Sequence, residues 1–364
     1  MKIAYLYTFG RLCRVERLAK KQAMDDFLYG SVQLRAKGHQ VDLFELPETS
    51  RHPIVRRIFN WMGKRDLLPH KVDGALIEQT LEVSPMLELY DVVVVAGSPV
   101  VFALAMCRWL GVRLPPLVGI HCGLLNYDFR TFQRFLTRHF LKRMWTVLFG
   151  EGEYQPLCDF LGHGKERIFV NECGTDIHFW TPGENLEQGY ILSIGNDGRR
   201  DYDLLVRAAA EIKSSFKIIT SREIREKIPS NVEIIRGDMR KEILSDEELR
   251  DIYRAALCVV VPLTETFQPS GQSVALQAMA CGKTVVLSRI NGIWSESKMR
   301  DKENIVFVKP GDKDDLVQKL NYVLEHPEKR REIGAKGLEI TRKEWSMESY
   351  AERIEKVCRT AIAG

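Results

Sequence analysis

Short apolar runs alternate with longer amphipathic segments along the whole chain. A run such as Lys2–Tyr7 is apolar at nearly every position, which is typical of a strand buried on both faces of a parallel sheet. Between the runs, apolar residues recur at helical spacing, as from Val15 to Ala36, where Gly38 follows as a helix-ending residue. Strands that alternate with helices predict a doubly wound parallel sheet. The first predicted strands are Lys2–Tyr7, Gln40–Leu46, Asp91–Ala96, Leu117–His121, Trp145–Phe149 and Arg167–Asn171.

The pattern restarts after a polar break at Thr181–Asn185, which contains Pro and Gly and has no periodicity. A chain of 364 residues is long enough for two such domains. We therefore predict an α/β protein with Rossmann-like domains at residues 1–180 and 181–344, followed by an amphipathic helix at 345–364. The second set of predicted strands is Gly189–Ile194, Phe216–Thr220, Val232–Ile235, Cys258–Pro262, Thr284–Leu287 and Asn304–Val308.

Composition narrows the setting without assigning a function. The chain is 45% hydrophobic and 28% charged with a net charge of +4, so we expect an ordinary globular protein with no nucleic-acid partner. Its eight cysteines are scattered without a Cys-x-x-Cys pair, which favours a reducing cytoplasm over a disulfide framework or a zinc site. We see no signal peptide at Met1, and no uncharged stretch reaches the roughly 20 residues that a membrane span needs.

The segment after Cys258–Pro262 carries the strongest candidate chemistry. A polar loop follows this strand, and a helix is predicted to begin near Ser270 or Gly271. Its first turn would present the backbone N–H groups of Gly271, Gln272 and Ser273 at the carboxyl edge of the sheet. Free N–H groups and the helix dipole bind anions such as phosphate. The alternative is a plain serine N-cap on a core helix.

The run from Gln268 to Val286 resembles the donor-site signature of family-4 retaining glycosyltransferases with the GT-B fold. The family pattern is Glu-x7-Glu followed by Ala-Met-Ala-x-Gly, and this chain keeps the second part at Ala278–Gly282. Gln277 stands where the second Glu, which holds the nucleotide ribose in the family, is expected. Pro269 stands at the first Glu, so we expect Glu265, four residues earlier, to take over the contact with the donor sugar.

The resemblance extends to both domains and implies two domains that face a cleft, with the C-terminal helix returning to the first domain. Gly195, Asn196, Arg199 and Arg200 follow a predicted strand where the family has the Arg and Lys that clamp the donor diphosphate. Arg200 is the expected stand-in for the Lys, because a guanidinium pairs with phosphate in a bidentate manner. Two solvated arginines at a helix start are the alternative.

In the first domain the resemblance singles out two positions. Gly10 follows the first strand and is expected to face the donor phosphate. His121 ends a later strand, where a family histidine lies near the donor sugar and phosphate. We expect His121 to hydrogen-bond to the sugar or phosphate during catalysis, and a purely structural hydrogen bond is the alternative.

No metal or other cofactor is expected beside the nucleotide-sugar co-substrate. The paired aspartates, such as Asp25-Asp26 and Asp314-Asp315, lie in helical contexts where carboxylates are usually solvated or cap a helix. In the family the leaving phosphate helps to deprotonate the acceptor, so no separate base is implied. Electrostatic stabilisation of the departing diphosphate would supply most of the effect.

These observations predict a metal-independent retaining glycosyltransferase that uses a nucleoside-diphosphate sugar, with UDP as the expected nucleotide. Its acceptor would be a small molecule, a glycan or a lipid-linked compound, as in cell-envelope glycan or secondary-metabolite synthesis. A nucleotide-sugar 2-epimerase and a non-catalytic nucleotide-sugar-binding module are the alternatives. Two basic amphipathic stretches, Arg51–Lys71 and Arg130–Trp145, suggest either peripheral contact with the inner face of a membrane or surface helices packed on the core.

Overall fold

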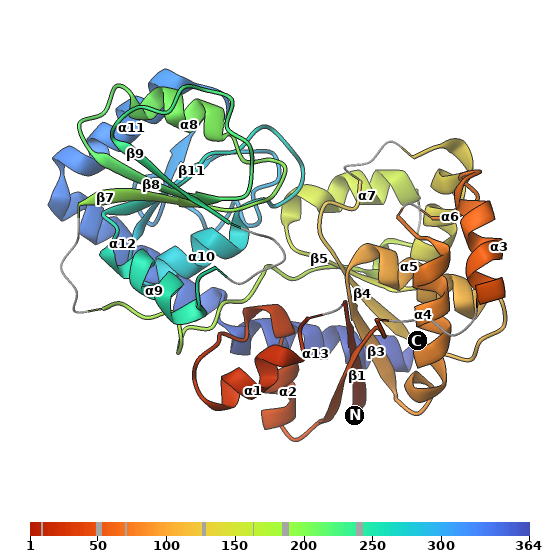
Figure 1. Cartoon of the computed structure of the whole chain (residues 1–364). Helices are drawn as coiled ribbons and strands as arrows, with labels where there is room; N and C mark the ends of the chain where they lie inside the picture. The colour runs from red at the N-terminus through yellow and green to blue at the C-terminus, as the bar shows by residue number, and fades with distance from the viewer. Residues whose placement is uncertain are drawn as a thin grey trace. The chain divides into compact units, whose positions relative to one another are not determined.

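The structure is a computed structural model of the chain, shown in Figure 1, and it describes residues 1–8, 10–48, 53–69, 71–125, 129–162, 164–183, 189–237 and 243–364. The chain divides into two compact units. Unit 1 comprises Met1–Glu16, Phe27–Glu172 and Tyr350–Gly364, and unit 2 comprises Arg17–Asp26 and Cys173–Ser349. The chain passes from unit 1 into the main part of unit 2 after Glu172, whereas the sequence predicts the domain boundary at residue 180. The N-terminal segment Arg17–Asp26 joins unit 2, which the sequence pattern does not indicate.

Unit 1 contains a parallel sheet of six strands in the order β2-β1-β3-β4-β5-β6. The continuous apolar runs explain the sheet, because β3 is fully buried from Val92 to Val95 and only a sheet covered on both faces hides such a run. The topology switches between β1 and β3. Its strands are β1 (Lys2–Tyr7), β2 (Gln40–Glu45), β3 (Val92–Ala96), β4 (Leu117–His121), β5 (Trp145–Leu148) and β6 (Ile168–Val170).

Helices connect these strands and supply most of the unit 1 core. Helix α5 follows β3 and buries nearly every side chain from Val100 to Cys107, whereas α3 buries none. The core helix α4 packs against both of them. The helices are α1 (Cys13–Ala19), α2 (Ser31–Ala36), α3 (Pro53–Gly63), α4 (Gly74–Leu87), α5 (Ser98–Trp109), α6 (Thr131–Leu141) and α7 (Tyr154–Leu161), with single 3-10 turns at Asp26–Leu28, Glu151–Glu153 and Lys165–Arg167.

Unit 2 contains a second parallel sheet of six strands, in the order β12-β11-β10-β7-β8-β9. The topology switches between β7 and β10, which lie side by side. All predicted strands of both domains are present, so the predicted α/β fold class is confirmed. The strands are β7 (Tyr190–Ile194), β8 (Ser215–Thr220), β9 (Val232–Arg236), β10 (Cys258–Val261), β11 (Thr284–Ser288) and β12 (Val306–Val308).

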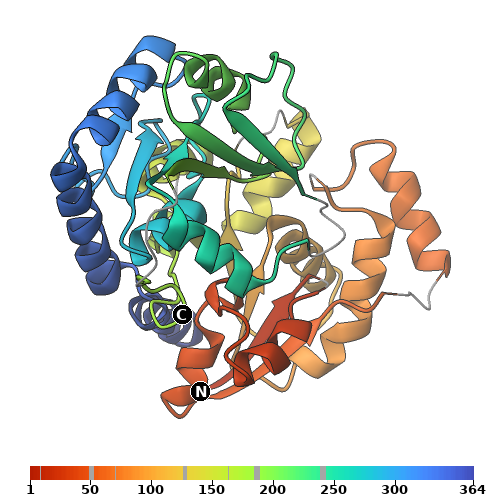
Figure 2. The same cartoon turned by 60° about the vertical axis from the view of Figure 1, so that its left-hand side comes forward.

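The unit 2 helices begin with clear sequence signals. Ser245 and Glu248 form a reciprocal capping box on α9, and Asp201 and Asp312 cap α8 and α11 through their carboxylates. The blue helices α11 and α12 follow one another along the left-hand side of Figure 2, and α12 also packs on α10 and β11. The helices are α8 (Tyr202–Ala209), α9 (Asp246–Ala255), α10 (Gln272–Ala280), α11 (Lys313–Glu325) and α12 (Pro327–Glu344).

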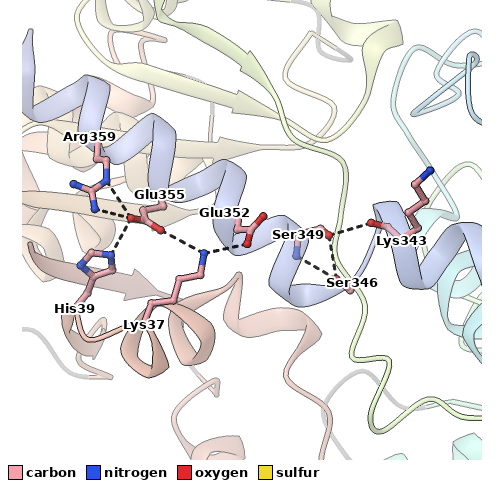
Figure 3. Close-up of polar contacts among 8 residues, drawn as sticks. All are labelled: Lys37, His39, Lys343, Ser346, Ser349, Glu352, Glu355 and Arg359. Atoms are coloured by element: carbon pink, nitrogen blue, oxygen red, sulfur yellow. Dashed lines mark hydrogen bonds and ion pairs between the residues drawn. The ribbon is translucent and has the colours of Figure 1, made fainter.

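The C-terminal helix α13 (Met347–Ala363) passes from unit 2 into unit 1, and residues from Tyr350 onward belong to unit 1. Its start is fixed at the junction with α12, where the Ser349 hydroxyl donates to the Lys343 carbonyl over 3.2 Å. Within unit 1, Glu355 accepts from Arg359 at 2.7 Å and lies 3.2 Å from His39 Nε2 (Figure 3). These bonds hold the pKa of the Glu355 carboxyl below its usual value, despite partial burial.

Candidate functional site

Two predicted donor segments of unit 2 lie together at the carboxyl edge of its sheet. One follows β7 and the other follows β10, on either side of the switch point. The Asp201 N–H donates to the Pro262 carbonyl over 3.0 Å, and the Thr264 N–H donates to the Arg199 carbonyl over 2.8 Å. Ligands of doubly wound sheets bind outside the carboxyl ends of the strands at such a switch point. The tertiary structure thus brings the two segments into the place where a nucleotide would bind.

Arg200 lies between these segments with its side chain only 2% exposed. Its Nε lies 2.9 Å from Asp197 Oδ2, while its Nη1 has no hydrogen-bond partner among the described residues. Two glycines make room for the guanidinium: a Cβ on Gly195 would lie 2.6 Å from Arg200 Nη2, and one on Gly271 would lie 3.3 Å from Nη1. A buried guanidinium with an unused donor is a favourable partner for a phosphate oxygen.

The N-terminus of α10 adjoins this guanidinium. Gly271 is the N-cap residue, with φ at 77°, and supplies no side chain to cap the helix. The Ser270 hydroxyl is buried and has no partner among the described residues. An uncapped helix start and an unused guanidinium nitrogen therefore lie close together, and the buried hydroxyl belongs to the residue just before the helix N-cap. Together they can hold an anion, because the partial positive charge of the helix end adds to that of the arginine.

The positions of the other predicted donor-site residues do not show whether their side chains contact a donor. The Asn196 side-chain oxygen accepts from the Ser221 N–H at 2.6 Å, so it fastens its loop to the end of β8. The Arg199 backbone carbonyl accepts the hydrogen bond from the Thr264 N–H described above. Gln272 is buried with 3% exposure, and Ser273 is half-buried in the first turn of α10. Donor contacts of these four side chains stay predictions.

Glu265 is exposed, and its carboxylate is used inside the protein. Its Oε1 accepts from the Thr266 N–H at 2.9 Å and from the Asn291 N–H at 2.8 Å. The side chain thereby fastens the loop after β10 to the segment after β11. The contact with a donor sugar stays a prediction, and any sugar would share this carboxylate with two backbone donors.

Gln277 is buried in α10 with 4% exposure, and both ends of its amide bond to protein groups. Its Nε2 donates to Asp26 Oδ2 over 2.8 Å, and its Oε1 accepts from the Tyr253 hydroxyl over 3.2 Å. A bond to a ribose hydroxyl would have to replace one of these contacts. The ribose role therefore stays a prediction, while the structure shows an internal role for this side chain.

In unit 1, His121 ends β4 as predicted, but its side chain is completely buried. Its Nδ1 lies 2.8 Å from the Ser98 hydroxyl, and its Nε2 has no partner among the described residues. Burial lowers the pKa of the imidazole to about 3, so the ring is neutral at pH 7. A Cβ on Gly119 would lie 2.6 Å from Nε2, so the ring fills space that only glycine leaves open. The expected bond to sugar or phosphate stays a prediction. The hydrogen bond that the structure shows for this ring is the one to Ser98.

Gly10 has a φ of 89°, and a Cβ there would meet nothing within 4 Å. The next backbone donors are already engaged, since the N–H groups of Arg11 and Leu12 both donate to Glu45 Oε1, the latter over 2.6 Å. A carboxylate of the protein thus occupies the anion-binding position of this loop. The predicted contact of Gly10 with a donor phosphate stays untested.

Comparisons with known proteins show which proteins this chain is similar to. The family described as "Glycosyl transferase-like" matches residues 199–356, which contain Arg200 and α10. A D-inositol 3-phosphate glycosyltransferase from Acidothermus cellulolyticus is 25% identical over 184 residues, which are 43% of this chain and 40% of that protein. Among solved structures, sucrose-phosphate synthase from Thermosynechococcus elongatus matches over 100% of both chains, with a TM-score of 0.71 and 16% identity. Alr3699/HepE from Anabaena in complex with UDP-glucose matches over 99% of this chain and 100% of its own, with a TM-score of 0.69 and 14% identity.

The chain has the GT-B fold and is related to the glycosyltransferases. The resemblance predicted from the sequence is thereby confirmed. The chain spans between 37% and 56% of the length of the curated relatives that it matches. The activity of this GT-B chain is therefore a matter for proposal.

Sequence reasoning missed a buried carboxylate of unit 2 that accepts several hydrogen bonds. Asp26 of this GT-B chain is 6% exposed and comes from the N-terminal segment. Besides Gln277, its carboxylate accepts from the Asp176 N–H at 2.6 Å, the Trp180 indole at 3.1 Å and the Thr175 hydroxyl at 3.3 Å. Burial outweighs these bonds and raises the pKa of Asp26 to about 6. Its position beside Asp25 indicated only a solvated or capping carboxylate.

In the part of the chain that the structure describes, no group of three or more His, Cys, Asp or Glu side chains is placed to hold a metal ion. Over the same residues, no helix is both long and apolar enough to cross a membrane.

Proposed function

We propose that this GT-B chain is a retaining glycosyltransferase that moves a sugar from a UDP-sugar to a hydroxyl group of an acceptor. The observation that carries the proposal is the meeting of Arg200, the Ser270 hydroxyl and the N-terminus of α10 at the switch point of unit 2. These groups suit a diphosphate, which is the leaving group of such a donor. The UDP-glucose complex of a protein with the same fold supports UDP as the nucleotide.

The proposed chemistry follows from where charge develops. The bond between the sugar C1 and the diphosphate oxygen breaks, and the acceptor oxygen forms a new bond to C1 on the same face. The acceptor proton passes to the departing phosphate. Negative charge therefore grows on the diphosphate, where the unused Nη1 of Arg200 and the helix end can stabilise it. We propose that these groups supply the positive charge for which other transferases use a metal ion.

A thermal-shift series with UDP-, GDP-, TDP- and ADP-sugars tests donor binding, because a ligand that binds only the folded state raises the melting temperature. We expect UDP-sugars to give the largest shift, with EDTA leaving it unchanged. Incubation of the best donor with a mixture of hydroxyl acceptors should then yield a product that keeps the anomeric configuration of the donor, as read from NMR couplings. No shift with any nucleotide sugar would contradict the proposal, and an inverted product would contradict the retaining chemistry.

The second candidate is a nucleotide-sugar-binding module without transfer activity. It is favoured by Glu265 and Gln277, since each uses its side chain for bonds inside unit 2. A clear thermal shift with a UDP-sugar, without product from any acceptor and without release of UDP, would support this candidate. Conversion of the donor to its C2 epimer without an acceptor would instead indicate an epimerase.

We further propose that unit 1 rests on an anionic membrane surface and receives a membrane-associated acceptor at the cytoplasmic face. On α3 the side chains of Ile54, Ile58 and Trp61 are 74%, 54% and 53% exposed, and they recur at helical spacing. Phe132 and Phe135 on α6 are also exposed, with ring centroids 6.2 Å apart. An ion pair between Arg130 and Asp66 joins the start of α6 to the end of the α3 segment. The same two segments carry exposed cations: Arg56, Arg57, Lys64, Arg65, Arg130, Arg134, Arg138 and Arg143.

Apolar side chains among cations suit the interface of an anionic bilayer. Co-sedimentation with phosphatidylcholine vesicles, with and without 30% phosphatidylglycerol at about 0.1 M salt, tests this surface. We expect binding to the anionic vesicles only, and a several-fold loss in Trp61→Ser. Trp109→Ser is the matched control, because Trp109 is 61% exposed on α5 and lies outside this surface. Equal binding of both variants would contradict the proposed surface. Residues 51, 52 and 70 of the predicted basic stretch lie outside the described residues.

A further inference from the structure

Unit 1 contains a partly open cavity of about 210 Å³ at the carboxyl edge of its own sheet. The cavity lies beyond the ends of β3, β4 and β5, where Ala96, Ile120 and Phe149 contribute to its wall. All of its lining residues belong to unit 1. It occupies the ligand-binding edge of a doubly wound sheet. None of the unit 2 hydrogen bonds described above involves these residues.

The wall of the cavity is built mainly from apolar and aromatic side chains. Four rings take part, and the Tyr29 and Phe149 rings stack with centroids 6.0 Å apart. An apolar cavity of about 150 Å³ is large enough to bind benzene, so this one can hold a larger ring compound. The principal apolar lining residues are Tyr29, Phe102, Ile120, Leu124, Phe129 and Phe149.

Ser98 adds a hydroxyl-bearing residue to this mostly apolar lining. It stands at the first position of α5 and lines the cavity, and its bond to His121 Nδ1 holds its orientation. A serine hydroxyl has one donor and two acceptor positions, so at least one position is left after this bond. His121 stays behind the wall, because Phe102 and Gly119 enclose its ring. It is a positioning residue for Ser98.

Cys122, Leu124 and Phe129, which follow β4, also line the cavity. The backbone N–H of Leu124 donates to Glu153 Oε1 over 3.1 Å, which fixes this part of the lining. Lys71 contributes an amine and Cys122 contributes an exposed thiol to the lining. The cavity is therefore a preformed site with an apolar interior and a few placed polar groups, which is the usual make-up of a small-molecule site.

We propose that this cavity binds the ring of a hydroxylated aromatic compound, whose hydroxyl group bonds to Ser98 and is the acceptor of the transferred sugar. This inference rests on the proposed transferase function, and it names the acceptor class. A polyol phosphate, as in the names of the curated relatives, fits poorly. Most of its hydroxyl groups would lose hydrogen bonds to water and find no partner in an aromatic wall.

In the transfer, the acceptor O–H bond breaks, its proton goes to the departing diphosphate, and its oxygen bonds to the sugar C1. Ser98 holds the reacting oxygen and keeps its own proton overall. Discrimination between acceptors therefore depends on two features of unit 1, the apolar volume of the cavity and the hydroxyl group of Ser98.

Protection of cysteines from alkylation tests the site without any transfer reaction. Cys122 and Cys13 are both exposed, but only Cys122 lines the cavity. With iodoacetamide and peptide mass analysis, saturating 2-naphthol should slow alkylation of Cys122 at least fivefold and leave Cys13 unchanged. myo-Inositol 3-phosphate should protect neither. Protection of Cys122 by the inositol phosphate, or no protection by 2-naphthol, would overturn the proposal.

Calorimetric titrations with 2-naphthol and naphthalene test the hydrogen bond to the Ser98 hydroxyl. Ser98→Ala should weaken 2-naphthol about tenfold and leave naphthalene unchanged, since one hydrogen bond is lost. His121→Phe keeps a ring in place but removes the hydrogen-bond partner of Ser98. It should therefore also weaken 2-naphthol and leave naphthalene unchanged. The double variant should show no further loss. A purely structural role of His121 would weaken both compounds equally and would contradict the positioning role.

Binding of UDP to the same preparations separates this inference from the proposed function. If UDP binds while 2-naphthol does not, only the acceptor class is wrong. If 2-naphthol binds while no nucleotide sugar does, the cavity is a ligand site and the transferase proposal fails, together with the acceptor role.

Discussion

The carboxyl edges of the two sheets can be compared directly, because each belongs to a six-stranded parallel sheet with one switch point. In unit 2 the edge collects a buried arginine, a serine hydroxyl and a helix N-terminus. In unit 1 the edge collects aromatic rings around one serine hydroxyl. The backbone scaffold is similar, so the loops and the first helical residues decide which ligand each edge suits. One edge is suited to an anion, and the other is suited to an apolar ring.

The two units also differ in how they hold a buried carboxyl group. Asp26 in unit 2 accepts from four groups, including Gln277. Glu153 in unit 1 bonds to Leu124 through Oε1, while its Oε2 has no partner among the described residues. Burial raises the pKa of Glu153 to about 7 and that of Asp26 to about 6. Burial is the largest cause of both shifts, and the hydrogen bonds that each carboxylate accepts offset part of it.

The largest expected effect comes from Asp26→Asn. An amide in this position must point an N–H group at the Asp176 N–H or at the donors of Trp180 and Gln277. Leaving such buried donors unpaired should lower the free energy of unfolding by roughly 3 kcal/mol or more. Urea denaturation with hydrogen exchange should locate the loss in unit 2. An unchanged stability would mean that the buried polar cluster around Asp26 contributes little.

Arg200→Ala tests the anion-binding edge of unit 2. Loss of a charge-assisted contact to phosphate should weaken UDP binding roughly 100-fold, or about 3 kcal/mol, as measured by calorimetry. The control is Arg207→Ala, because Arg207 is exposed on α8 and pairs with Glu226. Similar UDP affinities in the two variants would remove Arg200 from the donor site.

Glu153→Gln tests the sparsely bonded acid of unit 1 through pH dependence. The folded-state pKa of about 7 lies above the usual 4.5, so the folded protein keeps a proton that the unfolded chain releases. The wild-type free energy of unfolding should therefore fall as pH rises from 4.5 to 7. The variant lacks this contribution, so its stability relative to wild type should improve by up to about 3 kcal/mol between pH 4 and pH 8. Equal pH profiles would show that Glu153 is not desolvated.

Gly119→Ala should give the smallest of these effects, a loss of about 2 kcal/mol from overpacking. The added methyl group would meet both His121 Nε2 and the Val101 side chain. If the His121 ring is displaced, binding of 2-naphthol should weaken more than binding of naphthalene. The matched control is Gly198→Ala in unit 2, where a Cβ meets nothing within 4 Å. Equal losses in the two variants would argue against close packing at His121.

The candidate site was predictable where its chemistry is local. Gly195, Arg200 and Gly271 were singled out as candidates because a strand end, a glycine and a helix start are adjacent in the sequence, and their donor contacts stay predictions. Ser98 was missed because its meaning depends on His121, 23 positions away. Asp26 was missed for the same reason, since its partner Gln277 lies 251 positions along the chain.

The sequence by itself determined the two α/β domains, because continuous apolar runs and helical spacing are properties of neighbouring residues. It also indicated where α10 begins, and phosphate binding there stays a prediction. The tertiary structure decided which polar groups are buried together and which keep an unused bonding position. It placed Gln277 against Asp26 and left Arg200 Nη1 open, a distinction that no local pattern contains. The physical reason is that desolvation and hydrogen bonding depend on what surrounds a group in space, and those surroundings come from distant parts of the chain.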